Sequence, residues 1–453
     1  MTVNLVRPVT DGGLQHRVRD EQMRGDAYFD SPWPAEDGGA MRLASTSTVP
    51  LNIQPDDRLQ VTRRRTQLST MTILGAPGEV FLLTHSAMRA QLGFPTSSRV
   101  TRVDAQTLKT ISKSPRLPGG RMWPGGMALH RNGDLYVVYG NHAHRLDRGL
   151  SLRASLTLPH DLPYNSFVVL DCGLLVCKNI SDRVAARLCI IDPDTLRPVC
   201  AGIDCPEPSI ARLSARGDTV YVVGVKSIFR YHWDRAACRL IFDDGWRHDY
   251  ATGTQQSYGW DVVLARDHAW FMDNGHHRYR ISMIGAGVSL TPNRLIRVSL
   301  HDSSDHDSIE VSGLGGGSIT NPPVFDIRRQ IVVAMDSANK QLRAWRFNAV
   351  QRTLTPIWRR TNFGAASHML LYPSSGELVT NDYHDGCEYV AVLDIVTGEN
   401  LARAKIGAPL QGVVFPSPGW GRDFFWCSMG FVARVAVAQD KPLLLGGAET
   451  GRS

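Results

Sequence analysis

From about residue 57 onward, the chain alternates short apolar runs with clusters of turn residues. Runs such as Leu135–Val138 and Leu378–Thr380 have the length of strands, and no amphipathic helical pattern of useful length interrupts the series. Regularly spaced short strands are typical of an all-β sandwich, barrel or propeller. We therefore expect an all-β protein.

One unit of sequence recurs along this region. It consists of an apolar strand, a turn with Gly or Asp, a second apolar strand, a polar turn, a third strand, a turn with Asp and a fourth strand, and the clearest copy runs from Met369 to Ile406. Starts recur at intervals of about 40 to 60 residues, close to the period of a four-stranded propeller blade. The eight starts lie near Met71, Met127, Phe167, Ile210, Val262, Val324, Met369 and Val413.

The last unit has little chain left for a fourth strand. The alternating run Arg58–Thr66 could supply that strand, which would close the ring and leave few exposed edges. We predict a single β-propeller over residues 57–440 with eight four-stranded blades, or with seven if one start is a false repeat. The wide interval between Val262 and Val324 predicts an insertion near Gly275–Asn293.

The two ends of the chain lack this pattern. Residues 1–56 are polar and without periodicity, so we expect an irregular N-terminal arm that can wrap the fold, with Phe29, Trp33 and Pro34 as anchors. Residues 441–453 are expected to form a C-terminal tail.

Blade text such as Ala128–Val138 (ALHRNGDLYVV) and Val392–Gly398 (VLDIVTG) resembles the broad propeller superfamily that includes quinoprotein-like, gluconolactonase-like and strictosidine-synthase-like proteins. The resemblance covers roughly residues 60–437 and implies an architecture, not an activity. The repeated tryptophan-docking motifs of pyrroloquinoline quinone dehydrogenases are missing, so that cofactor is not implied. Gly313–Gly317 follows a strand without opening a helix, so no nucleotide is implied either.

The geometry of a propeller blade indicates where in the repeat a functional site could form. The innermost strand of a blade comes first and the strands alternate in direction, so the entrance to the first strand and the exit from the second lie on one face, near the central channel. Pockets of closed β folds form at such a mouth. Polar turns at 139–142, 273–276 and 381–384 follow second strands and carry histidine, so their side chains could converge.

Five histidines occupy these entrance and exit positions, and imidazole both transfers protons near neutral pH and binds divalent metal ions. The predicted catalytic residues are His384, His368, His276 and His142. The predicted ligands of one divalent metal ion are His85, His142, His276, His368, His384 and Asp382. The predicted substrate-binding residues are Trp123, Tyr258, Trp260, Arg278 and Asn381.

The same residue types also favour ordinary β turns, because His, Asn and Asp cap turns and tolerate left-handed backbone. A functional site therefore requires that these histidine side chains lie close together in space, whereas ordinary β turns do not. Asp261 and Gln411 share the strand-entrance position with His368 and belong to the same face.

The charge of the chain bears on whether the protein binds nucleic acid. The net charge is +7, but only seven of the 50 basic residues are lysine and the basic residues are scattered, with Arg63–Arg65 as the densest run. Nucleic-acid binding needs a continuous basic stripe, so we expect no nucleic-acid partner.

No apolar run approaches the roughly 20 residues of a membrane span, and Met1–Gly13 lacks the apolar core of a signal peptide. We therefore expect a cytoplasmic protein without a membrane partner.

Together these features favour a β-propeller enzyme that hydrolyses, or eliminates from, a small polar or anionic organic molecule at the channel mouth. Two alternatives stay open: a non-catalytic propeller scaffold for a protein partner, and an oxidoreductase whose metal is held by four histidines. The substrate, the metal and the oligomeric state are not specified by the sequence.

Overall fold

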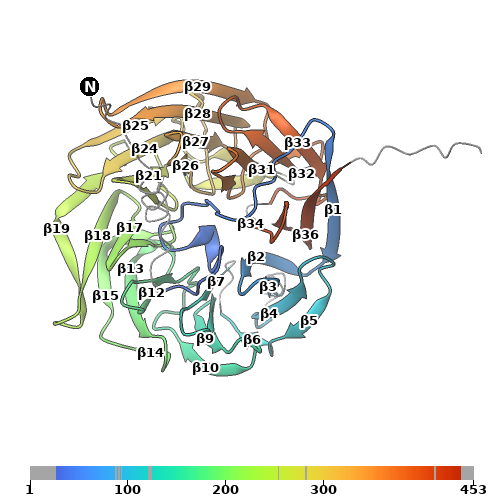
Figure 1. Ribbon diagram of the computed structural model, residues 1–453. Helices are drawn as coiled ribbons and strands as arrows, with labels where there is room; N and C mark the ends of the chain where they lie inside the picture. The colour runs from blue at the N-terminus through green and yellow to red at the C-terminus, as the bar shows by residue number, and fades with distance from the viewer. Residues whose placement is uncertain are drawn as a thin grey trace, which may run out of the picture.

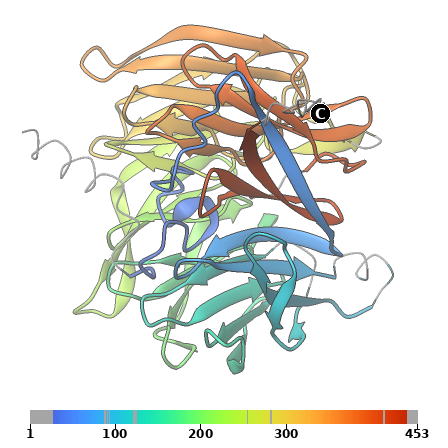
Figure 2. The ribbon, with the colours of Figure 1, turned by 45° about the vertical axis from the view of Figure 1, so that its right-hand side comes forward.

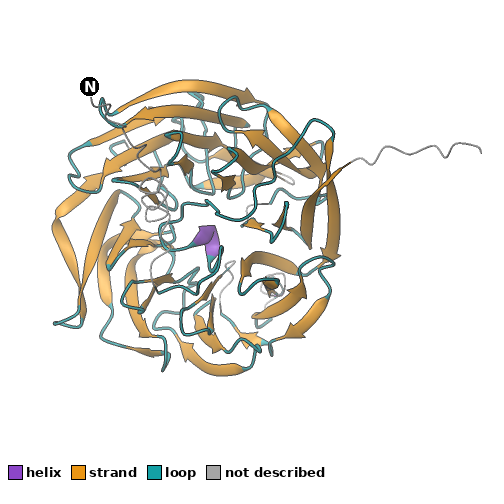
Figure 3. Cartoon of the chain, viewed as in Figure 1, coloured by secondary structure: helices purple, strands orange, loops and turns teal. Residues whose placement is uncertain are grey.

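Eight sheets stand side by side around a central axis; each has a path of four strands, and two of them carry a fifth strand (Figure 1). The computed structural model describes residues 27–439 apart from 87–88, 90–91, 93, 121–124, 254, 281–282 and 413–414. Strands make up most of this ring, and the 3-10 turn η1 (Glu36–Gly38) lies at its centre (Figure 3). The prediction of an all-β propeller with eight blades is confirmed.

The first four blades follow one another along the chain. Blade one contains β2 (Leu68–Leu74), β3 (Glu79–His85), β4 (Ser97–Asp104), β5 (Thr110–Lys113) and the short β6 (Leu117–Pro118). Blade two contains β7 (Gly126–Leu129), β8 (Leu135–Tyr139), β9 (His142–Leu146) and β10 (Leu152–Thr157). Blade three contains β11 (Val168–Val169), β12 (Leu175–Lys178), β13 (Ser181–Asp192), β14 (Arg197–Pro198) and β15 (Ile203–Ser209). Blade four contains β16 (Ser214–Arg216), β17 (Thr219–Val223), β18 (Ser227–Asp234) and β19 (Arg239–Asp249).

The last four blades include one insertion and the ring closure. Blade five contains β20 (Val263–Ala265), β21 (His268–Met272), β24 (Arg294–Ser299) and β25 (His306–Glu310). Blade six contains β26 (Val324–Asp326), β27 (Ile331–Asp336), β28 (Gln341–Asn348) and β29 (Thr353–Thr361). Blade seven contains β30 (Leu370–Tyr372), β31 (Glu377–His384), β32 (Cys387–Asp394) and β33 (Asn400–Lys405). Blade eight contains β34 (Ser417–Pro418), β35 (Asp423–Ser428), β36 (Phe431–Gln439) and β1 (Asp57–Arg65).

The burial of each strand explains its hydrophobic pattern. Inner strands are covered on both faces by neighbouring blades, so β27 is buried along its whole length and reads as a continuous apolar run. Outer strands such as β1 alternate between half-buried and exposed positions. Large side chains, among them Trp270, Trp345 and Trp426, fill the space between blades.

The ring is closed by strands from the two ends of the chain. β1 pairs antiparallel with β36 over nine residues, from Asp57 opposite Gln439 to Arg65 opposite Phe431. Figure 2 shows β1 lying along the outside of the final blade. This pairing confirms that an N-terminal strand completes the last blade.

The insertion expected near Gly275–Asn293 is a two-stranded hairpin. β22 (His277–Arg280) pairs with β23 (Met283–Gly287), and the hairpin lies between the second and third strands of blade five. It therefore extends the face that carries the strand entrances.

Residues 27–56 form an arm that crosses the ring and reaches its centre (Figure 1). The arm carbonyls accept hydrogen bonds from residues of several first strands, so the arm lies in the central channel against the inner strands of the blades. The pairs, as donor and acceptor, are Leu74 N with Trp33 O, Leu129 N with Pro34 O, Ala215 N with Ala40 O, Leu264 N with Met41 O, and Leu371 N with Ala44 O, at 2.8 to 3.0 Å.

The arm carries unusual backbone conformations. Asp37, Arg42 and Ala44 have φ of 52°, 54° and 51°, in the left-handed region that costs a residue other than glycine roughly 1–2 kcal/mol. Such conformations persist only where the surroundings over-determine them. The bonds to the blades and the ion pairs described below do so here.

Two further observations bound the fold. Among the described residues, no helix reaches the length and apolarity needed to cross a membrane. Residues 1–26 and the predicted tail at 441–453 lie outside the described residues.

Candidate functional site: a buried charged cluster in the channel

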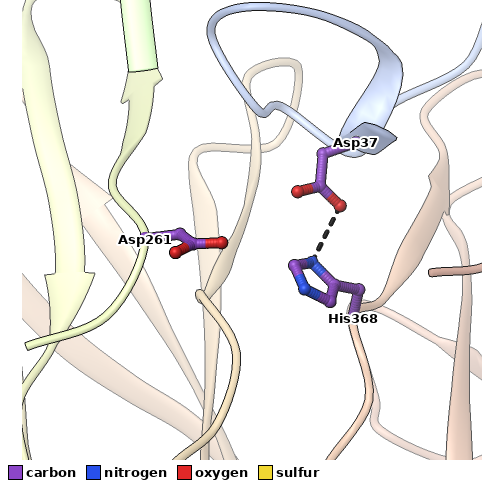
Figure 4. A group of neighbouring side chains, drawn as sticks. All are labelled: Asp37, Asp261 and His368. Carbon is purple, nitrogen blue, oxygen red and sulfur yellow. Dashed lines mark ion pairs between the residues drawn. The ribbon is translucent and has the colours of Figure 1, made fainter. Parts of the chain in front are cut away.

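The side chain of His368 meets two carboxylates inside the ring. Its Nδ1 lies 2.8 Å from Oδ1 of Asp37, and one ligand atom each from His368, Asp37 and Asp261 lie within 4.8 Å of one another. All three are at most 2 % exposed. Figure 4 shows the three side chains pointing toward one another from the arm, from the entrance to β20 and from the entrance to β30. Among the described residues, this is the group of His, Cys, Asp and Glu with the geometry to hold a metal ion.

Two buried arginines pair with the same carboxylates. Arg42, on the arm, contacts Asp37 at 3.2 Å and Glu36 at 2.9 Å. Arg212, before β16, contacts Asp261 at 3.2 Å and Glu36 at 3.3 Å. The five charged groups therefore form one continuous network between the arm and the blades.

Burial and charge act in opposite directions on these groups. Burial favours the neutral form of Asp261, but the positive charges of Arg212, Arg42 and His368 outweigh it and hold its pKa below the usual range. Burial is the larger influence on Glu36 and raises its pKa. The cluster thus places three carboxyl groups beside two guanidinium groups.

The free edge of the His368 ring distinguishes it from the other groups. Among the described residues, neither ring nitrogen makes a hydrogen bond of standard geometry, although Nδ1 lies 2.8 Å from Oδ1 of Asp37. The ring packs on Phe415, with ring centres 3.9 Å apart. An unpartnered nitrogen at this depth is free to accept or donate a proton.

A buried lysine lies in the same electrostatic environment. Lys178, the last residue of β12, donates to the carbonyl of Ser209 at 3.1 Å and makes no ion pair with a described carboxylate. Burial lowers its pKa to about 7, with Asp261 opposing and Arg212 adding to the shift. Its charge is therefore poised near neutral pH.

Asn381 fixes the segment that carries His368. Its Oδ1 accepts hydrogen bonds from the backbone N of Ala366 at 2.9 Å and of Ser367 at 3.1 Å, and its Nδ2 donates to Glu388 at 3.1 Å. Asn381 was predicted to bind substrate, and the structure shows it holding the entrance loop of blade seven. Burial raises the pKa of Glu388 to about 7.

The predicted residues of blades one and two lie apart from this cluster. His85 is buried at the end of β3 and stacks on Tyr139, with ring centres 5.3 Å apart, and burial lowers its pKa to about 4. His142 is half-buried and stacks on His144 at 6.1 Å. His144 uses both nitrogens, one with Ser155 and one with the carbonyl of Pro118.

Two predicted residues share a separate pocket of about 530 Å³ beside the inserted hairpin. His276 is exposed and stacks on Tyr258 at 5.8 Å, and Lys226 and Asp182 line the same pocket. Trp260 is buried and donates from Nε1 to the carbonyl of Gly275, so it fixes the loop rather than the pocket wall. Arg278 is exposed.

His384 and Asp382 form a third location at the end of β31. His384 is partly exposed, with Nδ1 3.4 Å from Oδ1 of Asp382, and Arg403 pairs with the same carboxylate at 3.0 Å. Trp123 lies outside the described residues. Of the five candidate histidines, the metal-competent group of the described residues contains His368 alone, and a role for the other four stays a prediction.

Sequence reasoning missed the contribution of the arm. The sequence places Glu36, Asp37 and Arg42 in an irregular polar segment and indicates no role for them. The predicted anchor Trp33 is 1 % exposed, as an anchoring role requires. Asp261 carried a signal, since it occupies the same strand-entrance position as His368. The arm residues carried none, because their position depends on how the arm crosses the ring.

No protein-family model matches the chain, and no curated protein matches it. Solved structures do match: BamB from Moraxella catarrhalis is 11% identical with a TM-score of 0.54, covering 83% of this chain and 99% of that chain. The Dos1 propeller is 10% identical with a TM-score of 0.53, covering 83% of this chain and 94% of that chain. At these identities the likeness concerns the fold alone. The chain therefore has a β-propeller fold, and the comparisons indicate no specific family.

Proposed function

We propose that the protein is an enzyme that uses His368 to transfer protons during hydrolysis of, or elimination from, a small anionic organic molecule. One observation carries the proposal: a buried imidazole lies 2.8 Å from Asp37, and its Nε2 has no hydrogen-bond partner in the described part of the chain. Groups with this arrangement in a water-poor environment are suited to general acid–base chemistry.

The chemistry of the pair follows from its geometry. Nε2 would take a proton from water, or from a carbon or hydroxyl of the substrate, and return it to the leaving group. Asp37 would stabilise the imidazolium formed in between, as a carboxylate does beside a catalytic histidine. The low local dielectric strengthens this attraction over its value in water.

Lys178 and Arg212 suit the recognition of an anion. Arg212 spans Glu36 and Asp261 and stacks over Phe415, with its guanidinium carbon 4.5 Å from the ring centre. Lys178 has no described carboxylate as an ion-pair partner, so a substrate carboxylate or a developing oxyanion could supply it.

The test is turnover of a panel of small anionic esters, lactones and hydroxy acids by the wild-type protein and by His368→Gln. Gln keeps a polar group of similar reach but cannot exchange a proton at neutral pH. We expect at least one substrate to be turned over, with a loss of about a hundredfold or more in the variant. Equal turnover by a folded His368→Gln protein would overturn the assignment.

A divalent cation is a second candidate partner for His368. Two carboxylates and an imidazole form a donor set that suits Mn, Fe or Zn. Arg42 and Arg212 weigh against it, because each already neutralises one of the two carboxylates at 3.2 Å. Elemental analysis of the wild type and of His368→Gln distinguishes a metal-free proton-transfer site from a metal site. Only a metal site predicts a stoichiometric ion in the wild type that the variant loses.

A non-catalytic scaffold is the rival function. The complete burial of the cluster favours it, because a network that only fixes the arm needs no access for a substrate. The scaffold account predicts that neither protein turns over any member of the panel and that His368→Gln changes stability alone.

A further inference from the structure

The densest basic run of the sequence ends at a pocket that the proposed function does not use. Arg64 and Arg65, at the end of β1, line a pocket of about 230 Å³ together with residues of blade one. The other basic residues of its lining are Arg89, Arg99, Lys113 and Arg116, and the lining contains no Asp or Glu.

The sheet geometry explains why these groups gather. Arg99 on β4 lies opposite Thr84 on β3, and Thr101 lies opposite Lys113 on β5. Directly paired positions, and positions two apart along a strand, share one face of a sheet. That face of blade one is met by β1, whose Arg64 donates to the carbonyl of Leu108 at 2.9 Å.

The positive charge of this pocket is not balanced by the protein. Elsewhere in the ring, arginines pair with carboxylates, as Arg145 does with Asp134 at 2.5 Å and Arg187 with Asp204 at 2.7 Å. None of the six basic groups of the pocket has an ion-pair partner among the described residues. Six like charges around one small pocket repel one another unless an anion enters.

Polar atoms at the pocket wall are also unpartnered. Thr66 Oγ1 and Arg99 Nε are buried and lack hydrogen-bond partners among the described residues. Both residues belong to the pocket lining, whereas the paired residues His85 and Ser98 alternate with Thr84 and Arg99 and lie on the opposite face of the sheet. Unsatisfied buried polar groups are costly, so their concentration at one pocket wall points to a missing polar partner.

We propose that this basic pocket binds a small phosphate-bearing molecule, which bridges the closing strand β1 and blade one. Arginine forks match phosphate oxygens and bind them with paired hydrogen bonds. The pocket is smaller than the roughly 300–1,000 Å³ of a drug-sized site, so the ligand has only a few heavy atoms beyond its phosphate. The site is distinct from His368 and does not depend on the function proposed for it.

Calorimetric titration with pyrophosphate and with inorganic phosphate, at constant ionic strength, tests the proposal. We expect pyrophosphate to bind more tightly than phosphate. The exposed double variant Lys113→Ala/Arg116→Ala should bind pyrophosphate at least about tenfold more weakly, and Arg99→Gln should show a similar loss. Arg183→Ala, a change to a side chain 90 % exposed on blade three, is the matched control and should bind as the wild type does.

Several results would overturn the proposal. They are an absence of pyrophosphate binding in the wild type, an equal loss in Arg183→Ala and the double variant, or tighter binding of a short oligonucleotide than of pyrophosphate. His368→Gln should bind pyrophosphate normally, so failure at His368 leaves this result unaffected.

The bridging role has its own readout. Because Arg64 and Arg65 belong to β1, pyrophosphate should slow amide hydrogen exchange in residues 57–65 and not in the outer strand of a distant blade, such as β29. Unchanged exchange in β1 on binding would contradict the bridge.

Discussion

The imidazole of His368 and the carboxylate of Asp37 lie 2.8 Å apart, although one belongs to the seventh blade and the other to the arm that precedes the propeller. The arm therefore completes the cluster from inside the channel. Because Asp37 lies on the arm, its contribution can be tested by substitution without changing a residue of the blades.

Asp37→Asn removes the charge beside His368 and keeps the size of the side chain. We expect turnover to fall by about a hundredfold, because the imidazolium formed during the reaction loses its ion-pair partner. Turnover by a folded Asp37→Asn protein equal to that of the wild type would show that Asp37 does not act through His368.

Arg42→Ala should destabilise the protein by about 3–5 kcal/mol, because it leaves Glu36 and Asp37 buried without their closest cation. The free energy of unfolding in denaturant measures the effect. Arg153→Ala is the control, since Arg153 is 60 % exposed in its pair with Asp147 and such pairs contribute at most about 1 kcal/mol. Equal effects of the two changes would contradict the arrangement of the arm.

Lys178 should make stability depend on pH in the alkaline range. Burial lowers its folded-state pKa to about 7 from 10.5, so the unfolded chain binds more protons between these values and stability rises with pH across them. The full rise is a few kcal/mol. Lys178→Met should lack this rise when unfolding free energies at pH 7, 8.5 and 10 are compared. A parallel pH dependence of the two proteins would argue against burial of the amine.

Asn381→Ala should reduce turnover although Asn381 does not contact His368. It removes the acceptor for the backbone N of Ala366 and Ser367, so the loop that ends at His368 loses its fixed position. We expect kcat to fall with little change in KM, and about 1–3 kcal/mol of lost stability. Asn381→Asp retains the acceptor but sets a carboxylate oxygen against Glu388 and the carbonyl of Gly412, to which Nδ2 donates, so it should not restore kcat. A large rise in KM instead would support the original prediction that Asn381 binds substrate.

The fold was more predictable than the site, for physical reasons. Blade number and ring closure follow from hydrophobic periodicity, which is a local property of runs such as Glu377–Thr380 and Arg58–Thr66. The face of His368 and Asp261 was also predictable, because strand direction fixes which ends share a face. The cluster as a whole was not predictable, because Asp37 and Arg42 lie on an arm that is held by backbone hydrogen bonds. Such bonds do not depend on the side chain, so they leave no pattern in the sequence.

The accessibility of His368 Nε2 tests the central claim most directly. Reaction with diethyl pyrocarbonate, followed by peptide mass spectrometry, reports which histidine nitrogens are both free and reachable. His144, which is buried with both nitrogens hydrogen-bonded, provides an internal reference. The account predicts that His368 is modified well before His144 and that turnover is lost in step with its modification. Protection of His368 equal to that of His144, or full turnover after its modification, would contradict the account.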